Sequence, residues 1–324
     1  MLALKIIVFL LGIAFTLFGY FIRFRGKYDL INGFEADFKQ GRKTEVYAKK
    51  IGTIEFVIGV SLLVICAILC LASFSDRKEA LQDYGVFLGI NGEDADRLNN
   101  YRLVIIEPSE FSEEEILELH ASGKSVYGYL NIGAIEEYRP YYDRFQDLFL
   151  DVYEGWPDER WIDAASPKWQ AFVIDELGRQ YADMGLDGLF LDNADVYYHY
   201  PTNNIFHGLC KILRGLKRYG LPLIINGGDP FVSRCMEENI ALSLFDGINQ
   251  ETVFTRIDFA NQTYGQQPEV DTAYFQEYLS KVKEFGLSVY LLEYRADRDL
   301  SKRIDEYCFE NSFIWYNATG MELR

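Results

Sequence analysis

The hydrophobic positions of the chain follow two different patterns that meet near residue 75. Residues 2–22 and residues 53–73 are almost uninterrupted apolar runs, each with one charged residue, Lys5 and Glu55, near its border. Each run has about the 20 residues that a helix needs to cross a bilayer. The first run lacks a small-residue cleavage site of the kind that ends a signal peptide, and a second run follows it. The pattern therefore predicts two retained transmembrane helices, with the lipid bilayer as a partner.

The segment between the two apolar runs, residues 23–52, carries eight Lys or Arg residues against four acids. Two basic residues, Arg77 and Lys78, follow the second run as a weaker counter-signal. The positive-inside rule places the more basic loop in the cytoplasm. We therefore expect residues 1–75 to form a two-span, multi-pass anchor in the cell membrane. A linker at 76–83 would join it to an extracytoplasmic domain over residues 84–324.

From residue 84 onward, short apolar runs alternate with amphipathic patterns. The strand-like runs occupy residues 84–90, 101–108, 125–133, 186–195, 221–228, 245–252, 287–294 and 312–319. Helical patterns cover residues 112–123, 167–185, 203–220 and 271–286, and each of them ends on a glycine. Ser112 and Glu115 have the spacing of a capping box at the start of the first one. Eight strands in alternation with helices predict a (β/α)8 TIM barrel of the α/β class. After the sixth strand, the stretch NQTYGQQPEV at 261–270 has the composition of a loop.

Charge and cysteine content exclude several functions. The formal net charge is −17, and residues 76–324 contain 23 basic and 44 acidic residues. Such an excess of acids argues against nucleic acid as a partner. It fits either an ordinary solvated surface or a field that attracts cationic ligands. The five cysteines show no CxxC spacing, which makes a disulfide framework or a zinc site improbable.

Polar residues gather where the predicted strands end. They are Glu107, Tyr129, Asn131, Asp192, Asn193, Asp195, Asn226, Glu251, Glu293, Tyr294 and Asn317. Each one alone reads most simply as a cap or turn former, but the active site of a TIM barrel lies at these carboxyl ends. Their joint placement therefore favours a shared site.

The residue types at these strand ends favour one class of reaction over others. The three histidines, His120, His199 and His207, fall on predicted helices or loops, so nucleophile triads and His-rich metal sites lack their residues. Acids, amides and aromatic rings are the mixture that cleaves glycosidic bonds. A magnesium or calcium site at residues 192–195 is an alternative, but no DxDxDG-like loop surrounds it. We expect no metal and no cofactor.

A long insertion, residues 134–166, follows the third strand and is rich in acids, Tyr and Trp. It is longer than a connection requires, which is typical of a loop that covers a site. A satellite hydrophobic core is the alternative interpretation.

Four stretches of the chain resemble a known family. They are YGYLNIGAIEEYR at 127–139, GWPDERWID at 155–163, GLDGLFLDNADVY at 185–197 and FDGINQETVF at 245–254. In this order they resemble the motifs of glycoside hydrolase family 114, the endo-α-1,4-polygalactosaminidase-like TIM barrels. The resemblance covers residues 84–319. Two positions depart from the family pattern, with Asp158 in place of a Gly and Gln250 in place of an Asn.

The resemblance implies that Asp192 and Glu251 are the catalytic pair. We assign Asp192 as nucleophile and Glu251 as acid/base, and the reverse assignment stays open. Further residues would bind or orient the substrate: Tyr129, Asn131, Glu136, Arg139, Trp161, Asp163, Asn193, Asp195, Asn226, Glu293 and Tyr294. Arg139 could instead pair with an acid as scaffold.

The implied function is that of a membrane-anchored, extracytoplasmic endo-glycosidase acting on a galactosamine-containing exopolysaccharide. A cationic polymer would suit the acidic domain. The alternative is an inactive barrel that binds polysaccharide, tethering the polymer or serving a synthesis complex.

Overall fold

The computed structural model describes residues 2–75, 81–153, 155–259 and 261–324, without the side chains of residues 2–7, 35, 36 and 66–75. The chain divides into two compact units, Met1–Ala80 and Leu81–Arg324. Residues 76–80 of the predicted linker lie outside the described residues.

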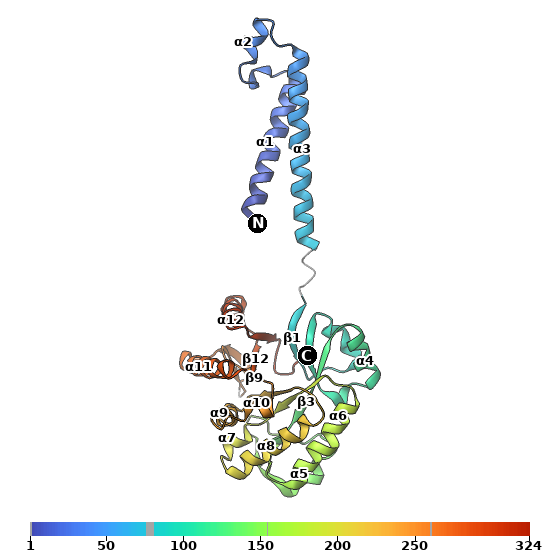
Figure 1. Cartoon of the computed structure of the whole chain (residues 1–324), viewed down its shortest axis with the longest axis vertical. Coiled ribbons are helices and arrows are strands. Elements are labelled where there is room, and N and C mark those ends of the chain that lie inside the picture. The colour runs from blue at the N-terminus through green and yellow to red at the C-terminus, as the bar shows by residue number, and fades with distance from the viewer. Residues whose placement is uncertain (1, 76–80, 154, 260) are drawn as a thin grey trace. The chain divides into compact units, whose positions relative to one another are not determined.

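The first unit is a helical hairpin. Its elements are α1 (Leu2–Arg25), the short turn η1 (Tyr28–Leu30), α2 (Phe34–Lys39) and α3 (Glu45–Ser75). Helices α1 and α3 pack along each other (Figure 1). Their backbones come so close that a methyl group on Gly19 would lie 2.2 Å from the backbone nitrogen of Phe56. Small residues at such crossings are typical of helices that pair in membranes.

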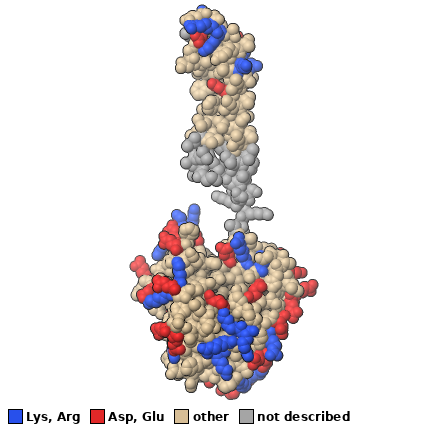
Figure 2. Space-filling model, viewed as in Figure 1, with Lys and Arg blue, Asp and Glu red and all other residues tan. Residues whose placement is uncertain are grey.

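Among the described residues, α1 is the one helix with the length and composition to cross a membrane, over Val8–Arg25. The predicted second span, residues 53–73, falls within α3. Its side chains from residue 66 onward lie outside the described residues, so the second span stays a prediction. Basic side chains gather at the end of the hairpin that holds α2, and the helical shaft carries few charges (Figure 2).

The second unit is built on an eight-stranded parallel sheet. Its order is β1-β2-β3-β7-β8-β9-β12-β13, with β13 beside β1, so that the sheet curls into a nearly closed barrel. The strands are β1 (Gln82–Phe87), β2 (Tyr101–Ile106), β3 (Ser125–Asn131), β7 (Gly188–Asp192), β8 (Leu223–Asn226), β9 (Gly247–Glu251), β12 (Ser288–Tyr294) and β13 (Ile314–Ala318). All eight predicted strands are present, and the predicted TIM barrel is confirmed.

Helices surround the strands (Figure 1). They include α4 (Glu113–Ala121), α5 (Pro167–Ala171), the π-helical η5 (Phe172–Gly178), α6 (Arg179–Asp183), α7 (Val196–His199), α8 (Asn203–Lys217), α9 (Asp229–Glu237), α10 (Ala241–Leu244), α11 (Glu269–Phe285) and α12 (Arg298–Asn311), with 3-10 turns η2 (Gly92–Leu98), η3 (Pro108–Glu110) and η4 (Tyr142–Leu148). The predicted capping box of Ser112 and Glu115 begins α4. Gly286 ends α11 at a φ of 99°, a left-handed conformation that glycine adopts without a steric penalty.

Two small antiparallel sheets interrupt the alternation. The insertion after β3 forms β4 (Ala134–Glu136), β5 (Phe149–Val152) and β6 (Glu159–Ile162), in the order β4-β6-β5. After β9, the hairpin β10 (Thr255–Asp258) and β11 (Thr263–Gln266) precedes α11. The prediction of a loop at 261–270 is therefore wrong for residues 263–266, which form β11, and for residues 269–270, which begin α11. The cause is tertiary, because the buried Glu293 carboxylate accepts hydrogen bonds from the backbone nitrogens of Phe254 and Thr255 and holds the root of the hairpin.

Candidate active site

A cavity of about 540 Å³ opens at the carboxyl ends of the barrel strands. Its polar and acidic lining comprises Glu107, Tyr129, Glu136, Tyr138, Tyr153, Asp158, Glu159, Asp192, Asn193, Asp195, Asn226, Gln250, Glu251, Thr252 and Tyr294. The insertion after β3 supplies one wall, which fits its predicted covering role. Among the described residues, no Lys, Arg or His lines this cavity.

Asp192 and Glu251 face each other across one amide group. They end β7 and β9, and Asn226 ends the intervening strand β8. The Asn226 Nδ2 donates to Asp192 Oδ1 over 2.9 Å and to Glu251 Oε1 over 2.8 Å. The two N–H bonds of an amide nitrogen diverge by about 120°, which separates the two acceptor oxygens by about 5 Å. This separation is typical of retaining glycosidases and shorter than that of inverting ones.

The amide of Asn226 is itself held in one orientation. Its Oδ1 accepts a hydrogen bond of 2.7 Å from Asn249 Nδ2, and the Asn249 Oδ1 accepts one of 3.1 Å from the Tyr84 hydroxyl. With its oxygen occupied in this way, the amide must present its two donors to the carboxylates. Tyr84 and Asn249 were not among the residues predicted for the site. The two-residue period of a strand does contain the signal, since Asn249 shares the inward face with Glu251.

Two tyrosines complete the hydrogen bonding of the pair. The Tyr129 hydroxyl donates to Asp192 Oδ2 over 2.8 Å, and the Tyr294 hydroxyl donates to Glu251 Oε2 over 2.7 Å. Burial raises the pKa of both carboxyls above the usual range, and these hydrogen bonds partly offset that effect. Both predicted tyrosines therefore act on the acids directly.

Two more acids of the cavity have raised pKa values. Burial, followed by the charge of Asp192, raises the pKa of Asp195 to about 7, and Asp195 Oδ1 accepts a hydrogen bond of 3.1 Å from the backbone of Gly228. Burial, followed by the charges of Glu136 and Asp192, raises the pKa of Glu159 to about 8. Glu159 lies in the quoted GWPDERWID stretch, but the sequence analysis gave it no role.

Asn193 holds an unusual backbone conformation beside the pair. Its φ of 64° is left-handed, which is uncommon for a residue with a side chain and typical of functional positions. The turn fits because Gly133 faces it, where a methyl group would lie 1.9 Å from the Asn193 carbonyl oxygen.

Arg139 lies behind the cavity wall. Its guanidinium donates two hydrogen bonds of 2.9–3.0 Å to Glu107 and two of 3.0 Å to Glu136, and all three side chains are buried. This pairing fits the scaffold alternative for Arg139 rather than contact with substrate. Glu136 still lines the cavity.

Four other predicted binding residues do not line the cavity. Asn131 caps a turn by accepting from the Ala134 backbone over 2.8 Å, and Asp163 does the same for Ala165 over 3.0 Å. Trp161 is 2% exposed, and its ring meets that of Tyr153 edge to face within the insertion, with centroids 4.3 Å apart.

The fourth predicted binding residue outside the cavity is Glu293, whose carboxylate accepts hydrogen bonds from the backbone nitrogens of Phe254 and Thr255 at the root of the β10–β11 hairpin. Each of these four side chains contacts a neighbouring backbone group or ring outside the cavity, so its role in substrate binding stays a prediction.

The mouth of the cavity carries two exposed aromatic rings that the sequence analysis did not single out. Trp156 comes from the insertion and Phe259 from the tip of the β10–β11 hairpin, and they are 41% and 45% exposed. Their rings meet edge to face with centroids 5.9 Å apart. Two segments far apart in the sequence therefore touch across the opening.

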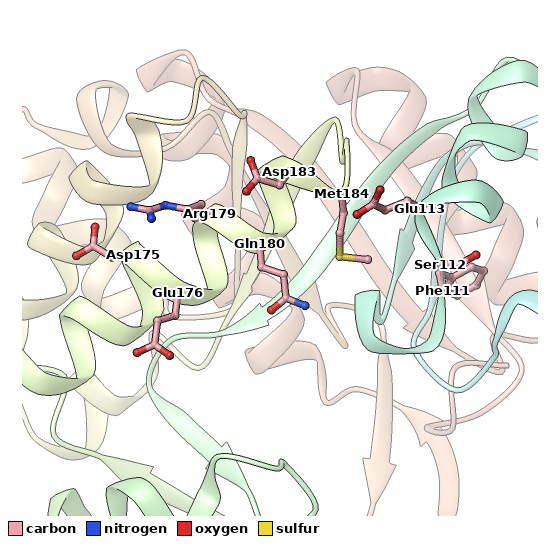
Figure 3. A pocket seen from close by; sticks show the side chains of 9 residues that line it. All are labelled: Phe111, Ser112, Glu113, Asp175, Glu176, Arg179, Gln180, Asp183 and Met184. Atoms are coloured by element: carbon pink, nitrogen blue, oxygen red, sulfur yellow. The ribbon is translucent and has the colours of Figure 1, made fainter.

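A second hollow, of about 600 Å³, lies outside the barrel between α4 and the η5–α6 helix (Figure 3). Two of its acids pair with arginines on the surface, Glu176 with Arg144 over 2.8 Å and Asp175 with Arg218 over 3.3 Å. None of the strand-end residues reaches it. Within the described part of the chain, no cluster of three His, Cys, Asp or Glu residues could hold a metal ion.

A protein family and several solved structures are similar to this chain. A family model described as glycoside-hydrolase family GH114 matches residues 75–317. The chain is similar in fold to the glycoside hydrolase domain of PelA from Pseudomonas aeruginosa, with a TM-score of 0.65 and 17% identity over 75% of this chain and 96% of that one. It is also similar to Ega3 from Aspergillus fumigatus, solved in complex with galactosamine, with a TM-score of 0.56 and 15% identity over 76% and 93%.

Two curated relatives are uncharacterized proteins. One, from Deinococcus radiodurans, is 28% identical over 136 residues, which are 38% of this chain and 44% of that one. The other, MJ1477 from Methanocaldococcus jannaschii, is 26% identical over 117 residues, or 32% and 34%. The chain thus spans less than half the length of the curated relatives it matches.

Proposed function

Because the chain belongs to glycoside-hydrolase family GH114, we propose that it is an endo-glycosidase that hydrolyses a galactosamine-containing exopolysaccharide through Asp192 and Glu251. The observation that carries this proposal is the single Asn226 amide bonded to both carboxyls. It sets them about 5 Å apart, where one sugar can lie between a nucleophile and an acid.

The hydrogen bonding favours Asp192 as the nucleophile. Its carboxylate accepts from Asn226, Tyr129 and the backbone of Asn193, whereas Glu251 accepts from Asn226 and Tyr294. More donors stabilise the ionised form better, so Asp192 is the acid that more readily stays charged. Glu251, whose pKa is raised by burial and by the charge of Asp192, keeps its proton for the leaving group.

The reaction then takes two steps. Glu251 donates its proton to the glycosidic oxygen while Asp192 bonds to the anomeric carbon, and the carbon–oxygen bond to the leaving sugar breaks. Water next attacks that carbon, Glu251 takes the proton from the water, and Asp192 leaves as a carboxylate. The anomeric configuration is retained.

The other predicted residues of the cavity act around this pair. Tyr129, Asn226 and Tyr294 orient the two acids, since each donates a hydrogen bond to at least one of them. Glu136, Asn193 and Asp195 line the cavity and would contact the sugar.

The substrate is proposed from charge and from similarity. Ega3, which shares the fold, was solved with galactosamine. Residues 76–324 hold 44 acids against 23 basic residues, and the cavity is lined by acids without a Lys or Arg among the described residues. A polymer that carries free amines fits such a field.

The first unit would anchor the enzyme in the cell membrane through residues 2–22 and 53–73. Support comes from the α1 helix, from its close packing on α3, and from the basic residues gathered near α2. With that basic end in the cytoplasm, the barrel would face outward.

The test is release of reducing ends from galactosaminoglycan by the full chain. Asp192→Asn and Glu251→Gln should each lower the rate by at least about 10³-fold with folding unchanged. Unchanged release in both variants would rule out the assigned pair. Tight binding without any turnover by the unmodified chain would instead favour the binding-only alternative.

A further inference from the structure

Two buried cysteines, Cys210 and Cys235, form a pair that the proposed reaction does not use. Cys210 lies in α8 and Cys235 in α9, the helices that come directly before and after strand β8 in the chain. Both are free thiols in the hydrophobic core of the barrel unit. Their spacing in the sequence gives no sign of a pair, because the two residues meet only through the packing of separate helices.

The packing of α8 on α9 is what brings the two cysteines together. The ring of Phe206 in α8 meets the ring of Phe231 in α9, with centroids 5.5 Å apart. Each cysteine lies four residues after one of these rings, and side chains four residues apart share one face of a helix. Both helices return from the carboxyl end of a parallel strand and so run in the same direction. One turn beyond the two rings, the thiols of Cys210 and Cys235 are accordingly hydrogen-bonded to each other.

The pair is suited to a covalent bond between its own sulfurs rather than to a metal ion. A structural zinc site takes about four protein ligands. Among the described residues, no group of three His, Cys, Asp or Glu could hold a metal, so the two thiols lack further ligands. Two adjacent thiols need only an oxidant to join as a disulfide. Their buried position would also protect such a bond from reductants in solution.

We propose that Cys210 and Cys235 form a disulfide that ties α8 to α9 around strand β8. The strand ends at Asn226, whose amide donates to both Asp192 and Glu251, so the bond holds the strand that positions the proposed catalytic pair. Disulfides form and persist in oxidising compartments outside the cytoplasm. The inference therefore rests on the outward-facing barrel of the proposed function.

The bond forms by exchange with a disulfide oxidant, either a protein or a small molecule of the oxidising compartment. One cysteine thiolate attacks a sulfur of the oxidant, and the other sulfur of the oxidant leaves and takes up the proton. The second cysteine then attacks the mixed disulfide and releases the remaining half of the oxidant as a thiol. Two cysteines are oxidised while one oxidant disulfide is reduced to two thiols. Because both cysteines are buried in the finished barrel, the exchange takes place before α9 docks on α8 during folding.

The experiment uses the full chain, extracted from membranes and treated in denaturant with an alkylating agent that blocks free thiols. Digestion and mass spectrometry then identify which cysteines are linked. Thermal unfolding of the full chain in detergent is measured with and without a thiol reductant. Cys210→Ala and Cys235→Ala remove the bond, and Cys308→Ala is the matched control, since Cys308 is also a buried free thiol but lies in α12.

The peptides that contain Cys210 and Cys235 should be recovered joined to each other, and Cys308 should be recovered alkylated. Reductant should lower the Tm of the unmodified chain by about 5–10 °C, the range expected for one disulfide in a domain of this size. It should leave the Tm of Cys210→Ala and Cys235→Ala unchanged and lower that of Cys308→Ala as in the unmodified chain. Comparing each chain with and without reductant separates the bond from the packing that alanine removes.

Two results would overturn the inference alone. One is recovery of both cysteines as alkylated thiols from a chain whose barrel is open to protease added outside intact cells. The other is a linked pair whose reduction leaves the Tm unchanged. A barrel protected from that protease would refute the outward placement, and this inference with it. A linked chain that neither binds nor cleaves galactosaminoglycan would refute the proposed activity and support the disulfide.

Discussion

Asn226 is the residue through which both proposed catalytic acids can be disturbed at once. Asn226→Leu keeps a side chain of similar size and removes the two donors that lie 2.9 Å from Asp192 and 2.8 Å from Glu251. Each carboxyl keeps its other hydrogen bond, from Tyr129 to Asp192 and from Tyr294 to Glu251. The change therefore isolates the electrostatic effect of the amide.

The magnitude follows from the two hydrogen bonds. A hydrogen bond to a charged group is worth about 1.5–3 kcal/mol, and each pKa unit corresponds to about 1.4 kcal/mol. The lost donor stabilised the ionised form, so its removal raises the pKa, by about 1–2 units for each acid. Both acids are already shifted upward by burial, and the loss adds to that shift.

The assay is kcat/KM on the amino-sugar polymer from about pH 4 to about pH 9. The acidic limb of this pH profile reports the pKa of the essential base, and the alkaline limb reports that of the essential acid. Both limbs should move to higher pH by about 1–2 units, and activity at about pH 5 should fall by about 10- to 100-fold. Asn317→Leu is the control, because Asn317 lies one residue before the end of β13 and bonds to the Ala296 backbone instead. A profile with unmoved limbs in a folded Asn226→Leu enzyme would refute the bridging role.

Three further predictions concern other parts of the barrel. Trp156→Ala or Phe259→Ala should raise KM for long polymer by about 2- to 10-fold, because one aromatic contact with the sugar chain is lost, and should leave kcat on short fragments unchanged. Equal effects on long polymer and on short fragments would argue against sugar binding by these two rings. Arg139→Leu should cost about 3–5 kcal/mol of unfolding free energy, because it leaves two buried glutamates unpaired; a denaturant titration with an unchanged midpoint would contradict this. Burial raises the pKa of Glu293 to about 7, so its contribution to stability is full below about pH 4.5 and is lost as pH rises through 7. Glu293→Gln should flatten the stability profile over that range, and an unaltered slope would count against the assignment.

Much of the barrel was predictable because its elements are encoded locally. Alternating apolar runs located all eight strands, and the capping box of Ser112 with Glu115 marked the start of a helix. The same logic failed at β11, since Thr263–Gln266 has no strand pattern of its own. Its pairing depends on Glu293, which lies in β12 and holds the hairpin root through backbone nitrogens.

The candidate site divides in a similar way. The sequence by itself determined that acids and amides end neighbouring parallel strands, and the period of a strand places Asp192, Asn226 and Glu251 at one rim. Periodicity alone does not distinguish Glu251 from Glu293, since both are acids near the end of a strand, and only the family resemblance separated them. The tertiary structure decided that Glu251 meets Asn226 and Glu293 meets backbone, because those partners come from other strands and loops. Local periodicity fixes which face a side chain takes, whereas its partner and its pKa depend on distances that only the closed barrel defines.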